Sequence, residues 1–164
     1  MPSFRRVHPV AHSAEQMFDL VADIEAYPQF LPLCTGLTVL SRRTKGEREA
    51  VNASMSVGYK RISETFTTQV ILNRPELAID VQYIDGPFKY LNNEWRFEPE
   101  GPNACRVHFF IDYEFRSRTL GLMMGSMFDR AFNMFVQAFE QRADAVYGPP
   151  SDSSARRSAA AAEI

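Results

Sequence analysis

The sequence predicts an α+β domain in which an antiparallel sheet with one apolar face is covered by a single long helix near the C-terminus. Three observations predict this class. Strand-like runs of alternating polarity follow one another with short turns between them, which favours an antiparallel meander. In the run Ala104–Arg116 every second side chain is apolar and the others are mostly charged, with Phe110 as the exception. Residues Thr119–Tyr147 have the apolar periodicity of one helix.

Length and composition are those of one globular domain. The chain has 164 residues, of which 45% are hydrophobic and 23% are charged, and this is enough for a core without disulfides or metals. We expect the domain to span residues 1–148. Residues 149–164 are rich in Ser, Ala and Arg and have no apolar face, so we expect them to form a disordered tail.

Charge and cysteine usage limit the partners and the compartment. The formal net charge is −2, so no global basic field attracts nucleic acid, and DNA is not expected as a partner. Cys34 and Cys105 lie far apart without CxxC or metal spacing, which favours two reduced thiols in a reducing compartment. No apolar run approaches the roughly 18 to 20 residues of a membrane span, and the N-terminus has no leader-like pattern. We therefore expect a cytoplasmic protein.

The first elements are a strand and a short helix. Phe4–Val10 reads as the strand. Residues Ser13-Ala14-Glu15-Gln16 form a capping box, because the side chains of Ser13 and Gln16 satisfy backbone N–H groups at a helix start. The apolar residues of the helix that follows recur at helical spacing before Pro28 ends it. They are Met17, Leu20, Val21 and Ile24.

The next segment, Tyr27–Cys34, contains two prolines among apolar and aromatic residues. Neither a helix interior nor a central strand tolerates prolines at this spacing, so we expect an irregular loop. Loops are usually polar, and this one is not. It either plugs one end of the core or forms a lid over an apolar ligand cavity or docking surface.

Six strand-like runs follow, each ended by Gly, Pro or Asn residues that mark turns. The runs are Leu37–Thr44, Glu47–Val57, Arg61–Leu72, Leu77–Ile84, Tyr90–Glu98 and Ala104–Arg116. Together with the first strand they make seven.

The last helix is long and unusually apolar. At 1.5 Å per residue it measures roughly 40 Å, which is about the diameter of the whole domain. Its apolar residues fill an arc of about 200° at 100° per residue. The helix is therefore nearly engulfed, lines a cavity or meets a partner. Its methionines either adapt to a flexible apolar ligand or fill the core. They are Met123, Met124, Met127 and Met134.

Motifs for catalysis or metal binding are not found in the sequence. His8, His12 and His108 have no metal spacing, and there is no nucleophile elbow, phosphate loop or dinucleotide fingerprint. We therefore expect no catalytic residue, no metal and no enzymatic activity. Glu64 shares a strand face with apolar residues, so it either looks into the interior, marks a change of register, or lies at a strand end open to water.

Short basic groups occur at three places in the chain. They are Arg5-Arg6, Arg42-Arg43-Lys45 and Lys60-Arg61. Solvated strand ends explain them, and contact with acidic lipid or RNA is the alternative.

An ordered set of motifs over residues 3–147 resembles a known family. The set consists of Tyr27–Cys34, Val57-Gly58-Tyr59-Lys60 leading to Glu64-Thr65-Phe66, Gly86-Pro87-Phe88-Lys89-Tyr90-Leu91 with Trp95-Arg96-Phe97, Asp112-Tyr113-Glu114-Phe115, and Ala138-Phe139-Glu140-Gln141-Arg142-Ala143. The chain resembles START-type helix-grip domains of the polyketide-cyclase-like superfamily. More narrowly, it resembles the coenzyme Q-binding protein family, whose bacterial members include proteins described as ribosome-association toxins.

The resemblance implies a helix-grip fold, in which a curved antiparallel sheet wraps around the long C-terminal helix and two short helices follow the first strand. It also implies that ubiquinone or a related polyprenyl lipid is bound in the sheet–helix cavity, by a non-catalytic lipid chaperone that supports respiration, with no other cofactor. Apolar residues on the inner face of such a cavity are the candidate ligand-binding residues. They are Phe30, Leu31, Met55, Phe66, Val81, Trp95, Phe109, Met124, Met127, Phe128 and Phe135.

Two other functions stay open at this point. A polyketide cyclase-type enzyme would need an acid or base in the pocket, for which Glu64, Tyr83 and Asn93 are the candidates. A ribosome-association regulator would have a ribosomal subunit as its partner. Transient contact with the inner membrane is a further alternative for a lipid carrier.

Overall fold

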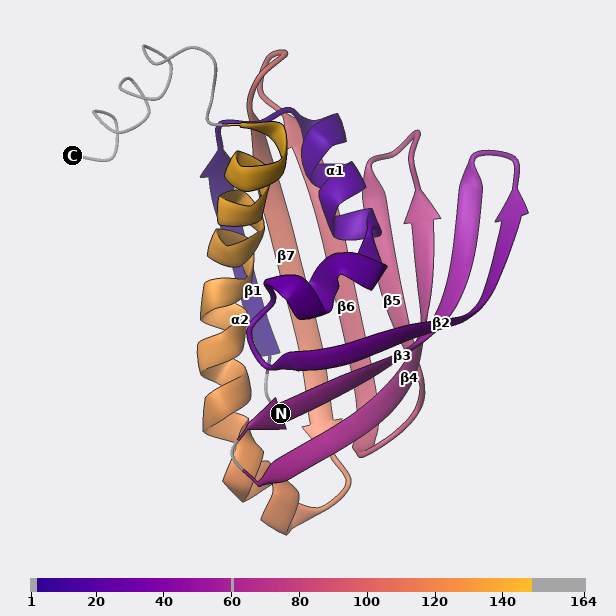
Figure 1. Cartoon of the computed structure of the whole chain (residues 1–164), viewed down its shortest axis with the longest axis vertical. Coiled ribbons are helices and arrows are strands. Elements are labelled where there is room, and N and C mark those ends of the chain that lie inside the picture. The colour runs from indigo at the N-terminus through magenta and orange to yellow at the C-terminus, as the bar shows by residue number, and fades with distance from the viewer. Residues whose placement is uncertain (1–2, 60, 149–164) are drawn as a thin grey trace, which may run out of the picture.

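The computed structural model describes residues 3–59 and 61–148, which form one curved sheet packed on one long helix (Figure 1). The elements in chain order are β1 (Ser3–Val10), α1 (Ala14–Ala22), the 3-10 helix η1 (Ile24–Gln29), β2 (Cys34–Lys45), β3 (Arg48–Tyr59), β4 (Ile62–Asn73), β5 (Ala78–Asp85), β6 (Phe88–Pro99), β7 (Cys105–Phe115) and α2 (Arg118–Tyr147). The predicted helix-grip class is confirmed. The predicted tail, residues 149–164, lies outside the described residues.

The sheet has seven strands in the order β1-β7-β6-β5-β4-β3-β2, and every neighbouring pair is antiparallel. Strands β2 to β7 are neighbours in sequence order because short turns connect them. β1 pairs with β7, with Phe4 opposite Ile111, so the first and last strands lie side by side. The sequence predicts the strands, and the pairing of β1 follows only from the structure.

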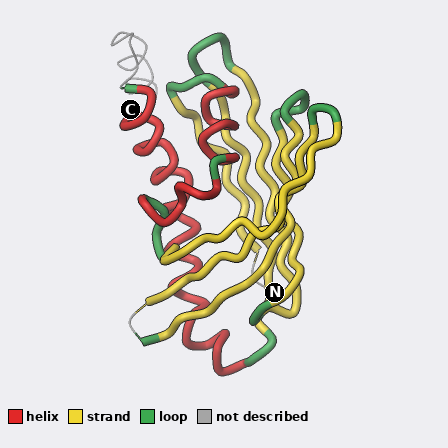
Figure 2. The backbone as a smooth tube through the Cα atoms, turned by 45° about the vertical axis from the view of Figure 1, so that its right-hand side comes forward, coloured by secondary structure: helices red, strands yellow, loops and turns green. Residues whose placement is uncertain are grey.

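The sheet bends so that β2, β3 and β4 turn toward α2 (Figure 2). Register shifts interrupt the β2–β3 ladder between Val39 and Ser41 and the β4–β5 ladder between Thr67 and Thr68. Such bulges add an unpaired residue to one strand, which bends the strand and increases its twist. The curvature leaves a concave face for the helix.

The predicted capping box begins α1. The Gln16 backbone N–H donates to the Ser13 hydroxyl at 3.1 Å, and the Ser13 N–H donates to Gln16 Oε1 at 3.2 Å. The helix then buries Met17, Phe18 and Val21 almost completely.

The 3-10 helix η1 continues from α1 and includes Tyr27 and Pro28, so the prediction of an irregular loop is wrong for this part of Tyr27–Cys34. A short 3-10 helix tolerates the proline because only one backbone bond is lost.

The inner face of α2 is aromatic. Phe128, Phe132 and Phe139 recur at helical spacing and are each at most 5% exposed. Their rings contact aromatic residues of β6 and β7, for example Phe132 against Tyr113 at a centroid distance of 5.5 Å and Phe139 against Trp95 at 5.2 Å. Edge-to-face pairs of this kind add to the stabilisation that burial provides. These contacts fix α2 across the concave face.

The helix is only partly engulfed. Met123 is 52% exposed, Met134 is 47% exposed, and Leu122 is almost fully exposed. Met124 is completely buried. The predicted apolar arc is therefore wider than the surface that the sheet covers, and two of the four clustered methionines face solvent.

Polar contacts tie the end of α2 to β1 and to the loop before α1. His12 Nε2 lies 2.7 Å from Asp144 Oδ1, and His8 Nε2 lies 3.3 Å from Glu140 Oε1. The Tyr147 hydroxyl donates to the Gln16 carbonyl at 3.2 Å.

Within residues 3–59 and 61–148, no helix combines the length and hydropathy that a membrane-spanning segment needs.

Both cysteines are free and buried. Cys105 is 1% exposed, and burial, with a smaller contribution from Glu100, raises the pKa of its thiol from 9.0 to about 12. Above pH 9 the unfolded chain releases this proton and the folded chain keeps it. The free energy of unfolding must therefore fall as pH rises from 9 toward 12, by up to about 1.4 kcal/mol per pH unit for this one group.

Between pH 8 and pH 10.5 the free energy of unfolding falls in the wild type. We predict that this fall is about 2 kcal/mol smaller in Cys105→Ala, because the variant lacks the thiol. Urea unfolding of both proteins at the two pH values measures this difference, and any packing defect left by the substitution cancels because it is present at both. An equal loss in wild type and variant would show that the Cys105 thiol ionises in the folded state as easily as in the unfolded one.

Candidate functional site

A cavity lies between the concave face of the sheet and α2, with η1 and the loop after it on one side. The cavity has a volume of about 110 Å³, which is smaller than the roughly 300 to 1,000 Å³ of sites that enclose a drug-sized ligand. Several waters fit into this volume without any movement of the wall, whereas a larger ligand requires the wall to open. The lining residues are Ile24, Tyr27, Leu31, Pro32, Leu33, Leu37, Ala53, Met55, Val57, Phe66, Thr68, Val70, Ile79, Val81, Leu91, Asn93, Trp95, Phe109, Ile111, Phe128, Ala131, Phe132, Phe135 and Phe139.

The wall is built by strand alternation on one side and helix periodicity on the other. Each strand from β3 to β7 contributes residues two apart, such as Met55 with Val57 and Asn93 with Trp95, and β2 contributes Leu37. Every second side chain points to the same face of a strand, so these residues share the concave face. α2 contributes residues three and four apart, such as Phe128 with Ala131 and Phe132. The wall is therefore almost wholly apolar.

The segment Tyr27–Cys34, which we call the lid segment, closes one side of this cavity. Leu31, Pro32 and Leu33 all line it. The Leu31 N–H donates to the Tyr27 carbonyl at 2.8 Å, and the Gly58 N–H donates to the Leu33 carbonyl at 2.9 Å, which ties the lid segment to β3. Leu33 has a φ of +68°, a left-handed conformation that is strained for a non-glycine residue.

Few polar groups face the cavity. Of the lining residues in the described part of the chain, none has a charged side chain or an imidazole. The Tyr27 hydroxyl donates to the Val21 carbonyl, and burial, followed by the nearby Cys34 and Asp23, raises the pKa of Tyr27 above its ordinary value. Thr68 and Asn93 bring a hydroxyl and an amide into the wall.

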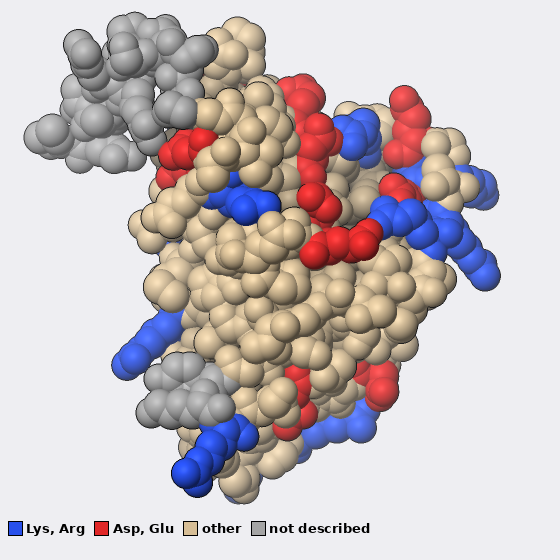
Figure 3. All heavy atoms as spheres, in the orientation of Figure 1, with Lys and Arg blue, Asp and Glu red and all other residues tan. Residues whose placement is uncertain are grey.

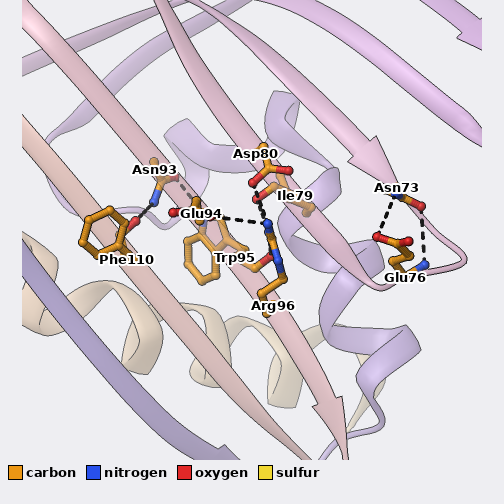
Figure 4. A network of polar contacts seen from close by, with 9 residues as sticks. All are labelled: Asn73, Glu76, Ile79, Asp80, Asn93, Glu94, Trp95, Arg96 and Phe110. Carbon is orange, nitrogen blue, oxygen red and sulfur yellow. Dashed lines mark hydrogen bonds and ion pairs between the residues drawn. The ribbon is translucent and has the colours of Figure 1, made fainter.

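Asn93 is held by two hydrogen bonds (Figure 4). Its Nδ2 donates to the Phe110 carbonyl at 2.8 Å, and its Oδ1 accepts from the Trp95 indole N–H at 3.0 Å. Trp95 is 4% exposed, so its N–H needs an acceptor inside the protein.

The structure brings most of the candidate ligand-binding residues together. Eight of the eleven line the cavity: Leu31, Met55, Phe66, Val81, Trp95, Phe109, Phe128 and Phe135. Their contact with a ligand stays a prediction.

Phe30, Met124 and Met127 do not line the cavity. The Phe30 ring packs behind the wall, against Phe139 at 5.2 Å, with the Arg142 guanidinium 5.2 Å from its centroid. Met124 and Met127 lie on α2 before Phe128, the first residue of the helix that faces the cavity. Sequence patterns identify the apolar face of the helix but not where along it the cavity begins.

The three residues considered as acids or bases are placed differently. Glu64 is half-buried near the start of β4 and does not line the cavity. It lies opposite the cavity-lining Val57, so it shares the concave face of the sheet but lies near the end of its strand. The Tyr83 hydroxyl accepts from the Phe88 backbone N–H at 3.0 Å and is also outside the wall. Only Asn93 faces the cavity. No group of three or more His, Cys, Asp and Glu residues is placed to hold a metal ion in the described part of the chain.

Several lining residues were missed by sequence reasoning. Thr68 and Leu91 lie on strand faces that alternation identifies as apolar, so that signal was available for them. Ile24 and Leu37 flank the lid segment and reach the cavity because of the turn of the chain between them. No local pattern marks such residues.

The lid segment yields a paired prediction. We expect Leu31→Ala to lower the free energy of unfolding by about 2 kcal/mol and to weaken the retention of bound apolar ligand, because Leu31 is buried in the cavity wall. Phe30→Ala, behind the wall, is expected to leave retention unchanged. Urea midpoints and the rate of quinone release measure the two effects. Equal release rates from both variants would show that the lid segment plugs the core and does not gate the cavity.

Comparison with known proteins shows which family the chain matches and which proteins it resembles. Residues 10–140 match the family described as polyketide cyclase / dehydrase and lipid transport. The chain is 42% identical over 147 residues to the ribosome association toxin RatA of Escherichia coli K12, covering 90% of each chain. It is 32% identical over 145 residues to the mitochondrial coenzyme Q-binding protein COQ10 of Drosophila melanogaster, covering 87% of this chain and 58% of that one. The solution structure of an 18 kDa protein of Caulobacter crescentus is 38% identical and has a TM-score of 0.75, covering 91% of this chain and all of that one.

Proposed function

Since the chain belongs to the polyketide cyclase / dehydrase and lipid transport family, we propose that it binds ubiquinone or a related polyprenyl lipid in its sheet–helix cavity. In this proposal it acts as a non-catalytic lipid chaperone that supports respiratory electron transport. The observation that carries the proposal is the cavity wall, in which the described lining residues are apolar or aromatic except for a few uncharged polar groups. The similarity to a coenzyme Q-binding protein supports the choice of ligand.

The wall suits a flexible apolar chain. Burial of apolar surface stabilises a complex by about 25 cal/mol per Å², without directional contacts. A polyprenyl tail gains this energy at every isoprene unit, and it is too insoluble to cross water uncovered. Leu33 of the lid segment and Phe135 of α2 are half-buried residues of the wall, and in this proposal a tail longer than the cavity leaves it beside them.

A carrier explains the site better than an enzyme does. Acid–base catalysis needs a titratable group within hydrogen-bond reach of the substrate. Among the described lining residues only Tyr27 titrates, and its hydroxyl is committed to the Val21 carbonyl and holds its proton more tightly than a free phenol. The described side chains of the wall therefore supply binding and exclusion of water rather than proton transfer.

Mass spectrometry of organic extracts tests the proposal. Natively purified protein should carry quinone or polyprenyl lipid at a sizeable fraction of one per chain. Ala131→Trp places a large ring in the cavity, because Ala131 is buried in its wall, and should reduce the bound lipid at least tenfold. Ala145→Trp is the matched control, since Ala145 lies exposed on the same helix. Empty wild-type extracts without saturable uptake of added quinone would refute the proposal.

Association with a ribosomal subunit is a second candidate, because the similarity to the ribosome association toxin covers 90% of both chains. The turn between β2 and β3 exposes Arg43, Lys45 and Arg48, and Figure 3 shows basic side chains at this projecting corner. Clustered cations bind the phosphates of RNA even on a chain of negative net charge.

Co-sedimentation with purified ribosomal subunits at low and high salt tests this candidate. Charge reversal of Arg43, Lys45 and Arg48 to Glu should abolish co-sedimentation. The same reversal of Lys89, Arg118 and Arg130, which are also exposed, should not. Binding that survives the first set, or is lost equally with both, would exclude the β2–β3 turn as the contact.

A further inference from the structure

Asn93 is an amide in the middle of an apolar wall. It lies on β6 between Leu91 and Trp95, which are 5% and 4% exposed, and opposite Ile111 of β7 and Val81 of β5. All of these residues line the cavity. Placing an amide among them costs free energy unless its hydrogen-bonding groups find partners. The presence of an amide at this position therefore requires a structural or functional explanation.

The orientation of the amide is fixed by the chemistry of its two partners. The Phe110 carbonyl can only accept and the Trp95 indole N–H can only donate, so Nδ2 must face the first and Oδ1 the second. A flipped amide would place donor against donor and acceptor against acceptor. After these two bonds, Asn93 keeps one N–H and one lone pair. Because Asn93 lines the cavity and is only half-buried, a molecule inside the cavity can approach its amide.

Aromatic rings surround this amide. Trp95 lies 4.7 Å from Phe109 between ring centroids, and Phe109 lies 6.2 Å from Phe135 of α2. All three line the cavity. Flat aromatic walls beside a single neutral donor suit a planar head group that carries an oxygen acceptor. The apolar remainder of the wall suits its tail.

We infer that the spare N–H of Asn93 donates a hydrogen bond to a carbonyl oxygen on the head of the bound lipid, and that the head lies against Trp95 and Phe109. This inference rests on the proposed function and adds the residue that recognises the head group of the lipid. Asn93 is a binding and specificity residue here. A neutral amide neither gives nor takes a proton, so recognition by Asn93 leaves the lipid chemically unchanged.

Isothermal titration with two ligands of equal tail length tests the inference. Decylubiquinone presents ring carbonyls, and decylbenzene presents an aromatic head without oxygen. For Asn93→Leu we expect decylubiquinone binding to weaken about tenfold, as for one lost hydrogen bond in an apolar site, and decylbenzene binding to change less than twofold. Thr68→Val removes the other non-aromatic polar group of the wall and is expected to change neither affinity by more than twofold.

A structural role for Asn93 alone gives a different result. If the amide serves only to satisfy Trp95, Asn93→Leu weakens both ligands equally or neither, and the inference is overturned while lipid binding by the wild type stands. Wild-type protein that binds neither ligand would overturn the proposed function as well.

A measurement on the wild type makes the test independent of whether Asn93→Leu folds. The side-chain N–H₂ signals of Asn93 are identified in a nitrogen–proton NMR spectrum by their proximity to the Trp95 indole proton. We expect one of the two protons to shift downfield on addition of decylubiquinone and neither to do so with decylbenzene. Identical responses to both ligands would refute a hydrogen bond to the head group.

Discussion

Replacing Trp95 with alanine is expected to lower the free energy of unfolding by about 3 to 5 kcal/mol. Trp95 is the only tryptophan of the chain and is 4% exposed. Its ring packs against Phe109 at 4.7 Å and Phe139 at 5.2 Å, so it joins β6 to both β7 and α2. Its removal also leaves Asn93 Oδ1 without the indole donor. Urea unfolding followed by circular dichroism measures the loss.

Phe110→Ala is the control for this prediction. Phe110 lies on the outer face of β7, half-exposed beneath the Arg5 guanidinium at 4.5 Å, so its truncation is expected to cost about 1 kcal/mol. A loss below about 1.5 kcal/mol for Trp95→Ala would mean that the cavity side of the sheet relaxes around the missing ring. The contact between β6 and α2 would then not depend on Trp95.

Gly86→Ala is expected to lower the free energy of unfolding by about 2 to 4 kcal/mol. Gly86 lies in the turn between β5 and β6 with a φ of +144°. A Cβ at this position would lie 2.5 Å from Phe66 Cβ and 2.9 Å from Phe66 Cα. The second atom belongs to the backbone of β4, so neither the turn nor the strand can yield without disturbing the wall that Phe66 forms.

Gly101→Ala separates strain from collision. Gly101 has a φ of +87°, and a Cβ there would meet nothing within 4 Å, so only the conformational cost of about 1 kcal/mol is expected. Thermal and urea unfolding of both variants give the comparison. If the two substitutions cost the same, the close approach of Gly86 to Phe66 contributes nothing to stability.

Several elements could be predicted because their causes are local. Alternation of side chains along β7 needs only the geometry of an extended chain, and the capping box of Ser13 and Gln16 needs only four consecutive residues. Helical spacing identified Phe128, Phe132 and Phe139 as the inner face of α2. The ordered set of motifs over residues 3–147, in which no single motif is diagnostic, was enough to identify the family.

The sites that could not be predicted depend on long-range packing. Alternation places Met55 and Trp95 on the apolar face of their strands, but only the curvature of the sheet decides that both reach one cavity. Met123 and Met134 satisfy the apolar period of α2 and yet are exposed, because the sheet covers less of the helix than its apolar arc offers. Phe30 is apolar and next to Leu31, yet it packs behind the wall against Phe139.

The sequence by itself therefore determined the seven strands, the helices α1 and α2, the apolar face of each and the family, since these follow from periods of two and 3.6 residues and from an ordered set of short motifs. The 3-10 helix η1 was not among them. Only the tertiary structure decided which apolar residues enclose a cavity and which fill the core. It also showed that Asn93 faces that cavity with an amide oriented by Trp95 and Phe110. Whether a side chain meets solvent, a neighbour or open space depends on segments far away in the chain, and no local pattern records where those segments pack.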